Sequence, residues 1–148
     1  MPLRVSVQRG DGARSTATSA ALALIERAAT AALETRGIAD AEVSVTLLGD
    51  RAIAALNQRW LEHDGPTDVI AFPLWADGEM PVGDVYVGVR QATRQARENG
   101  VPLSEELARL AIHGTLHVLG FDHPAGARRT RSRMWREQER ILSSVLAS

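Results

Sequence analysis

Apolar residues recur every three or four positions in five stretches of the chain, which is the spacing of a helix that packs on one side. This spacing predicts helices over 19–36, 50–60, 90–99, 104–119 and 129–146. Asp50 and Ser104 stand where a side chain commonly caps the first turn of a helix, and Gly120 stands where a helix commonly ends. Trp60 would lie on the apolar face of the second helix.

Alternating apolar and polar residues predict short strands in four other segments. One surrounds Val5, and the others are 42–48, 68–71 and 82–89. The turn residues Asp77-Gly78 separate the last two, so we expect these to pair as a hairpin-like unit. Strands and helices mix without strict alternation, and no repeat or linker divides the chain. The pattern therefore predicts one α+β domain over residues 1–148, with a small sheet covered by helices.

The segment HGTLHVLGFDH at 113–123 contains three of the four histidines. His113 and His117 are four residues apart on a predicted helix, so their side chains share one face, with Cβ atoms about 6 Å apart. Gly120 can leave the helix in a left-handed conformation and bring His123 to the same point. Three imidazoles favour Zn²⁺, one ion per chain, with a fourth position open to water as in catalytic sites. If Asp122 or Asp84 closed that position, the zinc would be structural.

Gly114 distinguishes this segment from three-histidine zinc proteases, which carry a glutamate there as the general base. Without the glutamate, peptide hydrolysis should be severely impaired, whereas a tri-histidine zinc site still lowers the pKa of its water to about 7. RNA would suit such a site because its 2′-OH is an internal nucleophile. We interpret Gly114 as removing the base and leaving room over the metal. Met134 follows downstream, as a methionine does in those proteases, although core packing is the commoner role.

Three aspartates are candidates for a catalytic or supporting role at this site. Asp68 and Asp84 lie on apolar strands, where a carboxylate is costly unless it is paired. Asp122 lies between Gly120 and His123, where it could form the turn, accept a hydrogen bond or accept a proton. The sequence leaves the general base unassigned.

All 17 positive side chains are arginine, but the formal net charge is −1, so no overall basic field indicates nucleic acid. A local cluster does follow the histidine segment. It begins with Arg128, Arg129 and Arg131 and continues to Arg140. Beside a metal site these arginines would suit RNA phosphates, whereas on a solvated helix they would be an ordinary charged surface.

The chain contains no cysteine, which excludes disulfides and thiolate metal ligands. Its first ten residues lack the apolar run of a signal peptide, and Glu26 and Arg27 interrupt the alanine- and leucine-rich stretch at 17–33. We therefore expect a cytoplasmic protein without a membrane partner.

Four ordered motifs resemble the YbeY family of bacterial metal-dependent endoribonucleases. HGTLHVLGFDH is similar to the family's H-G-x-L-H-L-x-G-[YF]-D-H, PTDVIAFP at 66–73 to its P-T-[DN]-V-L-S-F-P, and VGDVYVG at 82–88 to its L-G-D-[IV]-x-I-[SC]. The fourth is Leu56-Asn57 with Trp60 ahead of Asp64. The likeness extends from about residue 40 to the C-terminus, and the spacing between the motifs agrees.

This resemblance implies His113, His117 and His123 as the zinc ligands. It implies a compact α+β fold with a mixed sheet of about four strands, distantly like a zinc-protease core. It also implies single-stranded RNA as the substrate, with roles in maturing the 3′ end of 16S ribosomal RNA and in ribosome quality control. No DNA substrate is expected.

Two positions depart from the family pattern. Many members have an arginine, thought to face the substrate, where this chain has Leu61. Arg59 could replace it only if the helix presents Arg59 to the cleft. The family's serine before F-P is Ala71 here.

Two other functions remain open: a metal-dependent protease or other hydrolase with a replacement carboxylate, and a non-enzymatic ribosome-associated factor with a four-ligand structural zinc.

Overall fold

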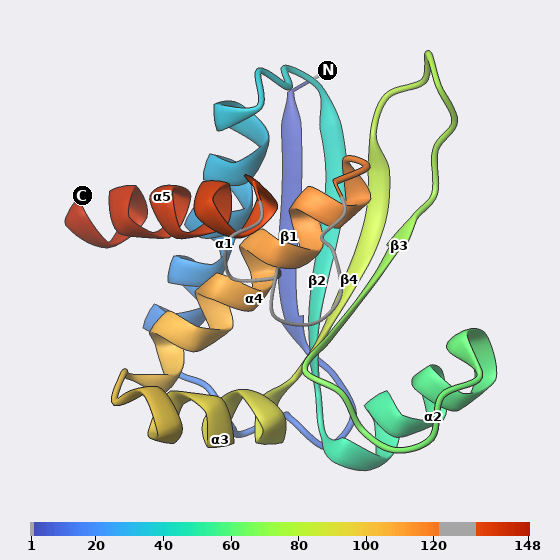
Figure 1. Ribbon diagram of the computed structural model, residues 1–148, viewed down its shortest axis with the longest axis vertical. Coiled ribbons are helices and arrows are strands. Elements are labelled where there is room, and N and C mark those ends of the chain that lie inside the picture. The colour runs from blue at the N-terminus through green and yellow to red at the C-terminus, as the bar shows by residue number, and fades with distance from the viewer. Residues whose placement is uncertain (1, 122–132) are drawn as a thin grey trace.

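The computed structural model describes residues 2–121 and 133–148, which form a four-stranded sheet with five helices (Figure 1). The strands are β1 (Leu3–Arg9), β2 (Ala41–Leu48), β3 (Val69–Pro73) and β4 (Val82–Gly88). The helices are α1 (Ser19–Thr35), α2 (Asp50–Leu61), α3 (Val89–Asn99), α4 (Leu103–Val118) and α5 (Arg133–Ala147). The α+β class and the mixed four-stranded sheet expected from the sequence are confirmed.

The sheet has the strand order β1-β2-β4-β3. β1 pairs with β2, and β2 with β4, in parallel, while β3 and β4 are antiparallel neighbours. The hairpin-like pairing predicted for the last two strands is therefore correct. Side chains alternate between the two faces of a strand, so Val85 of β4 points to one face of the sheet and its neighbours Asp84 and Tyr86 point to the other.

Helices cover the two faces unequally. α1 and α4 pack on one face over a buried apolar core, and α5 packs on α1 and α4, farther from the sheet (Figure 1). α2 covers part of the other face, where Ile53 packs with Leu48 and Ile70. Met134, at 1% exposure, belongs to the core between α1, α4 and α5, so packing is the role that the structure gives it. No helix in the described ranges is long and apolar enough to cross a bilayer.

Three local expectations were wrong. Gly49 and Pro102, rather than Asp50 and Ser104, occupy the N-cap positions of α2 and α4, and neither helix start has a side-chain cap hydrogen bond. At α4 the Pro102 carbonyl accepts from Glu105 and Glu106 instead, so the serine is already inside the helix. Trp60 is 59% exposed. Asn57 is buried on α2 and donates from Nδ2 to the Gly65 carbonyl at 2.9 Å.

Candidate functional site

His113 and His117 lie one turn apart on α4, as their spacing predicts. Their ring centroids are 4.8 Å apart and the ring planes meet at 68°. Both line a hollow of about 340 Å³ between α4, the start of β3 and the end of α2. The other lining residues are Leu61, Thr67, Asp68, Val69, Ile70 and Ala71.

A hydrogen bond from α5 selects the tautomer of one of these rings. His113 Nδ1 lies 2.7 Å from Gln138 Oε1. The Gln138 amide donates from Nε2 to the Glu139 carboxylate at 3.0 Å, which leaves its oxygen facing the imidazole. Because that oxygen only accepts, Nδ1 carries the hydrogen and Nε2 keeps its lone pair in the neutral ring. This is the tautomer that binds a metal through Nε2.

Arg109 holds the carboxylates behind this hydrogen bond. Its Nε lies 2.9 Å from Glu139 Oε2, and its other nitrogens reach Glu105 and Glu106. Burial raises the pKa of the Glu106 carboxyl against the opposing effect of Arg109, and the nearby charges of Asp68 and Glu139 raise it further. Burial lowers the pKa of the Arg109 guanidinium, but Glu139 and Glu106 outweigh burial and raise it above its ordinary value. A connected polar network therefore supports His113 from both α4 and α5.

The chain leaves α4 through the turn that the sequence predicts. Gly120 has a φ of +98°, a conformation that side chains disfavour. Its N–H donates to the His117 carbonyl at 2.9 Å, and Phe121 N–H donates to the Leu116 carbonyl at 2.9 Å. This pair of bonds is a Schellman motif. The chain thus reverses within three residues of His117, while the predicted ligand His123 lies outside the described residues.

Gly114 faces the sheet rather than the hollow's open space. A Cβ atom on it would lie 2.4 Å from Val85 Cγ1 and 3.3 Å from Val69 Cγ2. The interpretation that Gly114 leaves room over a metal was therefore wrong, because the two valines fill that space. The glycine instead lets α4 approach β3 and β4 closely.

The structure separates the two strand aspartates. Asp68 lines the hollow, where Oδ2 accepts from Gln95 Nε2 at 3.2 Å and Oδ1 from Thr67 Oγ1 at 3.4 Å. The neighbours of Asp84 on β4, Gly83 and Val85, face α4. Because side chains alternate along a strand, Asp84 lies on the face of the sheet away from α4. There it raises the pKa of Tyr86, after the larger effect of burial.

The predicted RNA-binding residues do not line this hollow within the described part of the chain. Arg59 is exposed, and its guanidinium carbon lies 5.3 Å from the centroid of the Trp60 ring. Leu61, at the family's arginine position, does line the hollow and is 43% exposed. The remaining candidates lie outside the described residues: Asp122, Arg128, Arg129 and Arg131.

Sequence reasoning missed Gln138 and Arg109. Gln138 follows His113 by 25 positions, and no sequence period links them. The available signal was the polarity of a buried position: Gln138 is 4% exposed within an apolar helix face, and a buried amide needs a partner. Within residues 2–121 and 133–148, no three His, Cys, Asp or Glu side chains are placed to hold a metal together. The imidazole pair is therefore the part of the predicted ligand set that the structure describes.

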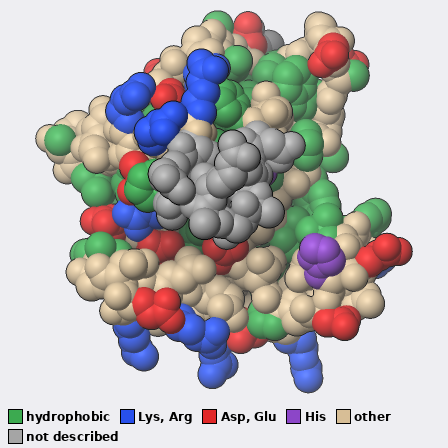
Figure 2. All heavy atoms as spheres, in the orientation of Figure 1, with side chains coloured by type: hydrophobic (Ala, Val, Ile, Leu, Met, Phe, Trp, Pro, Cys, Tyr) green, Lys and Arg blue, Asp and Glu red, His purple; other side chains and the backbone are tan. Residues whose placement is uncertain are grey.

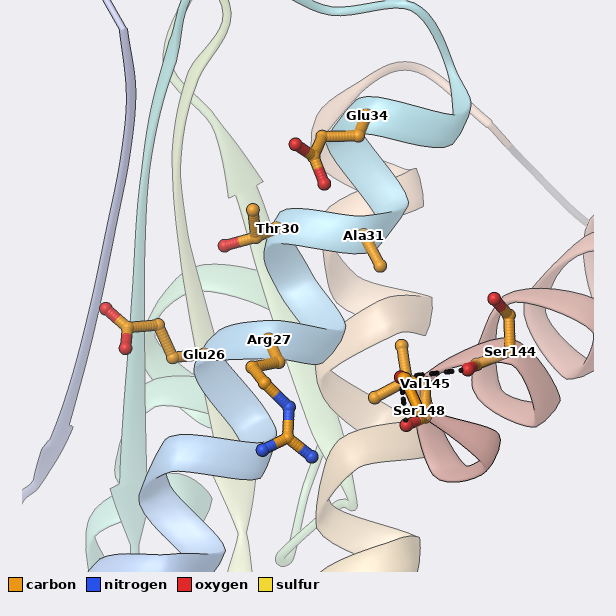
Figure 3. A pocket seen from close by; sticks show the side chains of 8 residues that line it. All are labelled: Glu26, Arg27, Thr30, Ala31, Glu34, Ser144, Val145 and Ser148. Carbon is orange, nitrogen blue, oxygen red and sulfur yellow. Dashed lines mark hydrogen bonds between the residues drawn. The ribbon is translucent and has the colours of Figure 1, made fainter.

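A second hollow, of about 350 Å³, lies between α1 and the end of α5 (Figure 3). Its charged lining residues are Glu26, Glu34 and Arg27, and its remaining lining residues are small or apolar: Thr30, Ala31, Ser144, Val145 and Ser148. Ser148 Oγ donates to the carbonyls of Ser144 and Val145, which closes the last turn of α5. Its described lining has two carboxylates and no imidazole, fewer than three metal-ligating side chains, so this hollow is not a candidate metal site.

Comparison with known proteins assigns the chain to a family. The family model described as Endoribonuclease YbeY matches residues 7–146. The chain belongs to the YbeY family. The Endoribonuclease YbeY of Moorella thermoacetica is 43% identical over 136 residues, which cover 84% of this chain and 86% of the relative. That of Thermus thermophilus is 40% identical over 127 residues, covering 83% and 87%.

A solved structure agrees with the fold. The solution structure of TM1509 from Thermotoga maritima superposes with a TM-score of 0.62 at 28% identity, covering 98% of this chain and 89% of the other. The YbeY match includes α4, β3 and α5, which together position His113, Asp68 and Gln138. The family assignment expected from four motifs is thus confirmed over most of the chain.

Proposed function

We propose that this protein is a metal-dependent endoribonuclease that cleaves single-stranded RNA at the hollow beside α4. Membership of a family named for endoribonuclease activity supports the reaction. The observation that carries the location is the pair of imidazoles, His113 and His117, at one hollow with a ring separation of 4.8 Å.

The donor set fits a divalent metal. Two neutral imidazoles on one helix face, with His113 held in the Nδ1–H tautomer, suit Zn²⁺ best among common ions. We propose His123 as the third ligand, because Gly120 turns the chain back directly after His117. A metal held there would supply Lewis-acid polarisation of a phosphate oxygen and make water more acidic. Gln138 keeps the His113 ring in the binding orientation.

We assign Asp68 a positioning role in the hollow. Both of its carboxylate oxygens accept hydrogen bonds, from Gln95 and Thr67. The family motif takes either Asp or Asn at this place, and hydrogen bonding is what the two side chains share. Asp68 therefore ties β3 to α3 at the edge of the hollow, and proton transfer is not required of it.

Family membership also supports a more specific biological role. We propose that the substrate is ribosomal RNA, that the reaction matures the 3′ end of 16S rRNA and serves ribosome quality control, and that the protein acts in the cytoplasm on ribosomes. The resemblance of the four motifs implies this role. In cells lacking the gene, RNA sequencing should show 16S rRNA with an extended 3′ end that a plasmid copy corrects and a His117→Ala copy does not.

The proposed activity is tested by cleavage of a labelled single-stranded RNA by purified protein. Wild type should cleave it, and chelator or His117→Ala should each reduce the rate by at least about a hundredfold, the scale on which loss of a metal's electrostatic contribution is felt. His63→Ala is the matched control, because His63 is exposed on the loop after α2 and should leave cleavage unchanged. Equal cleavage by wild type, chelated protein and His117→Ala would identify a contaminating nuclease and refute the proposal.

The same preparations test the two alternatives. A protease would hydrolyse an unstructured protein such as casein in a chelator-sensitive way, and we expect no such hydrolysis. A structural zinc would make the chelated protein unfold. We expect circular dichroism to show that the chelated protein keeps its helices, because the apolar cores between the sheet, α1, α4 and α5 form without the metal.

A further inference from the structure

A third hollow, of about 420 Å³, is lined by four arginines. Its lining residues are Arg36, Phe121, Arg133, Arg136, Glu137 and Arg140. Basic side chains gather at the upper left of Figure 2, in the region where the C-terminal end of α1 extends above α5 in Figure 1. The hollow therefore combines four guanidinium groups with one carboxylate.

Helical spacing places three of these arginines side by side. Arg133, Arg136 and Arg140 occupy positions i, i+3 and i+7 of α5, which share one face of a helix. All three side chains are exposed. Arg36 is the C-cap residue of α1, so the fourth guanidinium group reaches the hollow from a different helix.

Contacts with Glu137 and Phe121 hold two of these arginines, Arg36 and Arg140, in place. Glu137 Oε2 lies 3.1 Å from Arg140 Nη1, and its Oε1 lies 3.9 Å from Arg36 Nη1. The Arg36 guanidinium also lies over the Phe121 ring, 4.3 Å from its centroid. Among the described lining residues, four guanidinium groups stand with one carboxylate. Planar guanidinium forks are suited to bidentate binding of phosphate.

In its described lining, the histidine hollow lacks the positively charged side chains that line the hollow beside Phe121. Among the described residues that line the histidine hollow, there is no arginine, and Asp68 contributes a negative charge that repels phosphate. The hollow between α1 and the end of α5 is no substitute, since Glu26 and Glu34 outnumber Arg27 in its lining (Figure 3). Of these three hollows, by their described lining residues, the one beside Phe121 has the most guanidinium groups.

We propose that the hollow lined by Arg36, Arg133, Arg136 and Arg140 binds backbone phosphates of a single-stranded RNA. The choice of RNA as ligand rests on the proposed function. α5 connects this hollow to the histidines, because Glu137 contacts its arginines while the next residue, Gln138, contacts His113. An RNA held by these arginines would contact the helix that also supports His113, without contributing to the chemistry, so RNA affinity and RNA cleavage can be measured separately.

The test measures binding of a fluorescent, unstructured single-stranded RNA to the full chain by anisotropy at low salt. All proteins carry His117→Ala, so that the RNA is not cleaved during the measurement. Adding R133Q/R136Q/R140Q should weaken binding by at least about tenfold and lower the slope of log affinity against log salt by about 2, at about 0.7 for each lost phosphate contact.

The matched control removes the same charge elsewhere. R90Q/R94Q/R97Q takes three arginines from α3, and it should change affinity less than about threefold. The double variant R133Q/R136Q keeps the Arg140–Glu137 ion pair and should give an intermediate loss even if the triple variant folds poorly.

The outcomes distinguish this site from the proposed function. If wild type fails to cleave RNA but the α5 variant still loses RNA binding relative to the α3 control, the binding site stands and the activity fails. If wild type cleaves RNA while the α5 and α3 variants bind it equally well, the binding site is overturned. A loss of affinity for an acidic polypeptide, with RNA affinity unchanged, would overturn it in favour of a protein partner.

Discussion

At the scale of single residues, the amide of Gln138 decides how His113 can act. Its Nε2 donates to Glu139, so its oxygen faces the imidazole and selects the Nδ1–H tautomer. A histidine ligand with one fixed tautomer loses less freedom on metal binding than one that exchanges between two tautomers. Side chains that hydrogen-bond a ligand histidine in this way commonly change metal affinity by about 10–100-fold. Gln138 is therefore a positioning residue for the proposed metal.

Replacing Gln138 tests this role. Gln138→Leu should weaken Zn²⁺ affinity by about 10–100-fold, measured by competition with a fluorescent chelator. Nitrogen NMR of metal-free protein should show the His113 ring as a mixture of tautomers. Gln58→Leu, at an exposed position of α2, is the control. Equal zinc affinity in Gln138→Leu and wild type would show that the hydrogen bond has no positioning role.

Arg109 gives a prediction about pH. Arg109→Met leaves Glu105, Glu106 and Glu139 without their shared cation, and of the three carboxylates Glu106 is the buried one, with 4% of its side chain exposed. Breaking a buried ion pair costs about 3–5 kcal/mol, which is the upper end of the loss expected here. Burial raises the folded pKa of the Glu106 carboxyl, and Arg109, which opposes that rise, is absent from the variant. The variant is therefore destabilised most at neutral pH and regains stability as pH falls toward about 4.3, the ordinary glutamate pKa.

Urea unfolding at pH 7.5 and pH 5.5 measures this effect. The deficit of Arg109→Met relative to wild type should be clearly smaller at pH 5.5. Arg97→Met, on the exposed side of α3, should be close to wild type at both values. A deficit independent of pH would attribute the loss to side-chain packing rather than to the carboxylates.

At the scale of elements, the close approach of α4 to β4 positions the histidines. The contact is reciprocal, since Val85 of the strand fills the space beside Gly114 and Val118 of the helix fills the space beside Gly83. Either glycine would collide with its valine if it carried a side chain. The helix thus lies at a distance from the sheet that only these small residues permit.

Gly114→Ala tests this packing. Alanine favours a helix over glycine by about 1 kcal/mol, but the Cβ clash with Val85 should outweigh this gain and destabilise the protein by about 1–3 kcal/mol. Val85→Ala removes the clashing methyls. The double variant should therefore lose less unfolding free energy than the sum of the two single-variant losses, by at least about 0.5 kcal/mol. Urea unfolding of all four proteins completes the cycle. Strictly additive losses would contradict a direct contact.

Element-level predictions succeeded where a local pattern carried the information. The four-residue spacing of His113 and His117 and the position of Gly120 follow from helix geometry alone, and the structure agrees with both. The role of Gly114 could not be predicted, because it depends on which strand α4 crosses. Ser104 was a reasonable cap by composition, but Pro102 is extended and its carbonyl already begins the helix.

At the scale of the whole molecule, the sheet places Asp68 and Asp84 differently, although their sequence contexts are similar. Asp68 and Asp84 both lie at or on apolar strands, yet only Asp68 reaches the histidine hollow. The difference comes from strand register and face, which the antiparallel pairing of β3 with β4 sets. Contacts between distant segments, such as that of Gln138 with His113, were likewise beyond prediction from the sequence because no local period encodes them.

The most direct test of the account is a titration of Zn²⁺ into metal-depleted protein while RNA cleavage is followed. The account predicts no cleavage without metal and a rate that rises linearly and saturates at one equivalent per chain. His117→Ala should stay inactive throughout, and His63→Ala should follow wild type. Cleavage at the full rate before any metal is added, or equal activation of His117→Ala, would contradict the claim that the two imidazoles on α4 hold the metal that cleaves RNA.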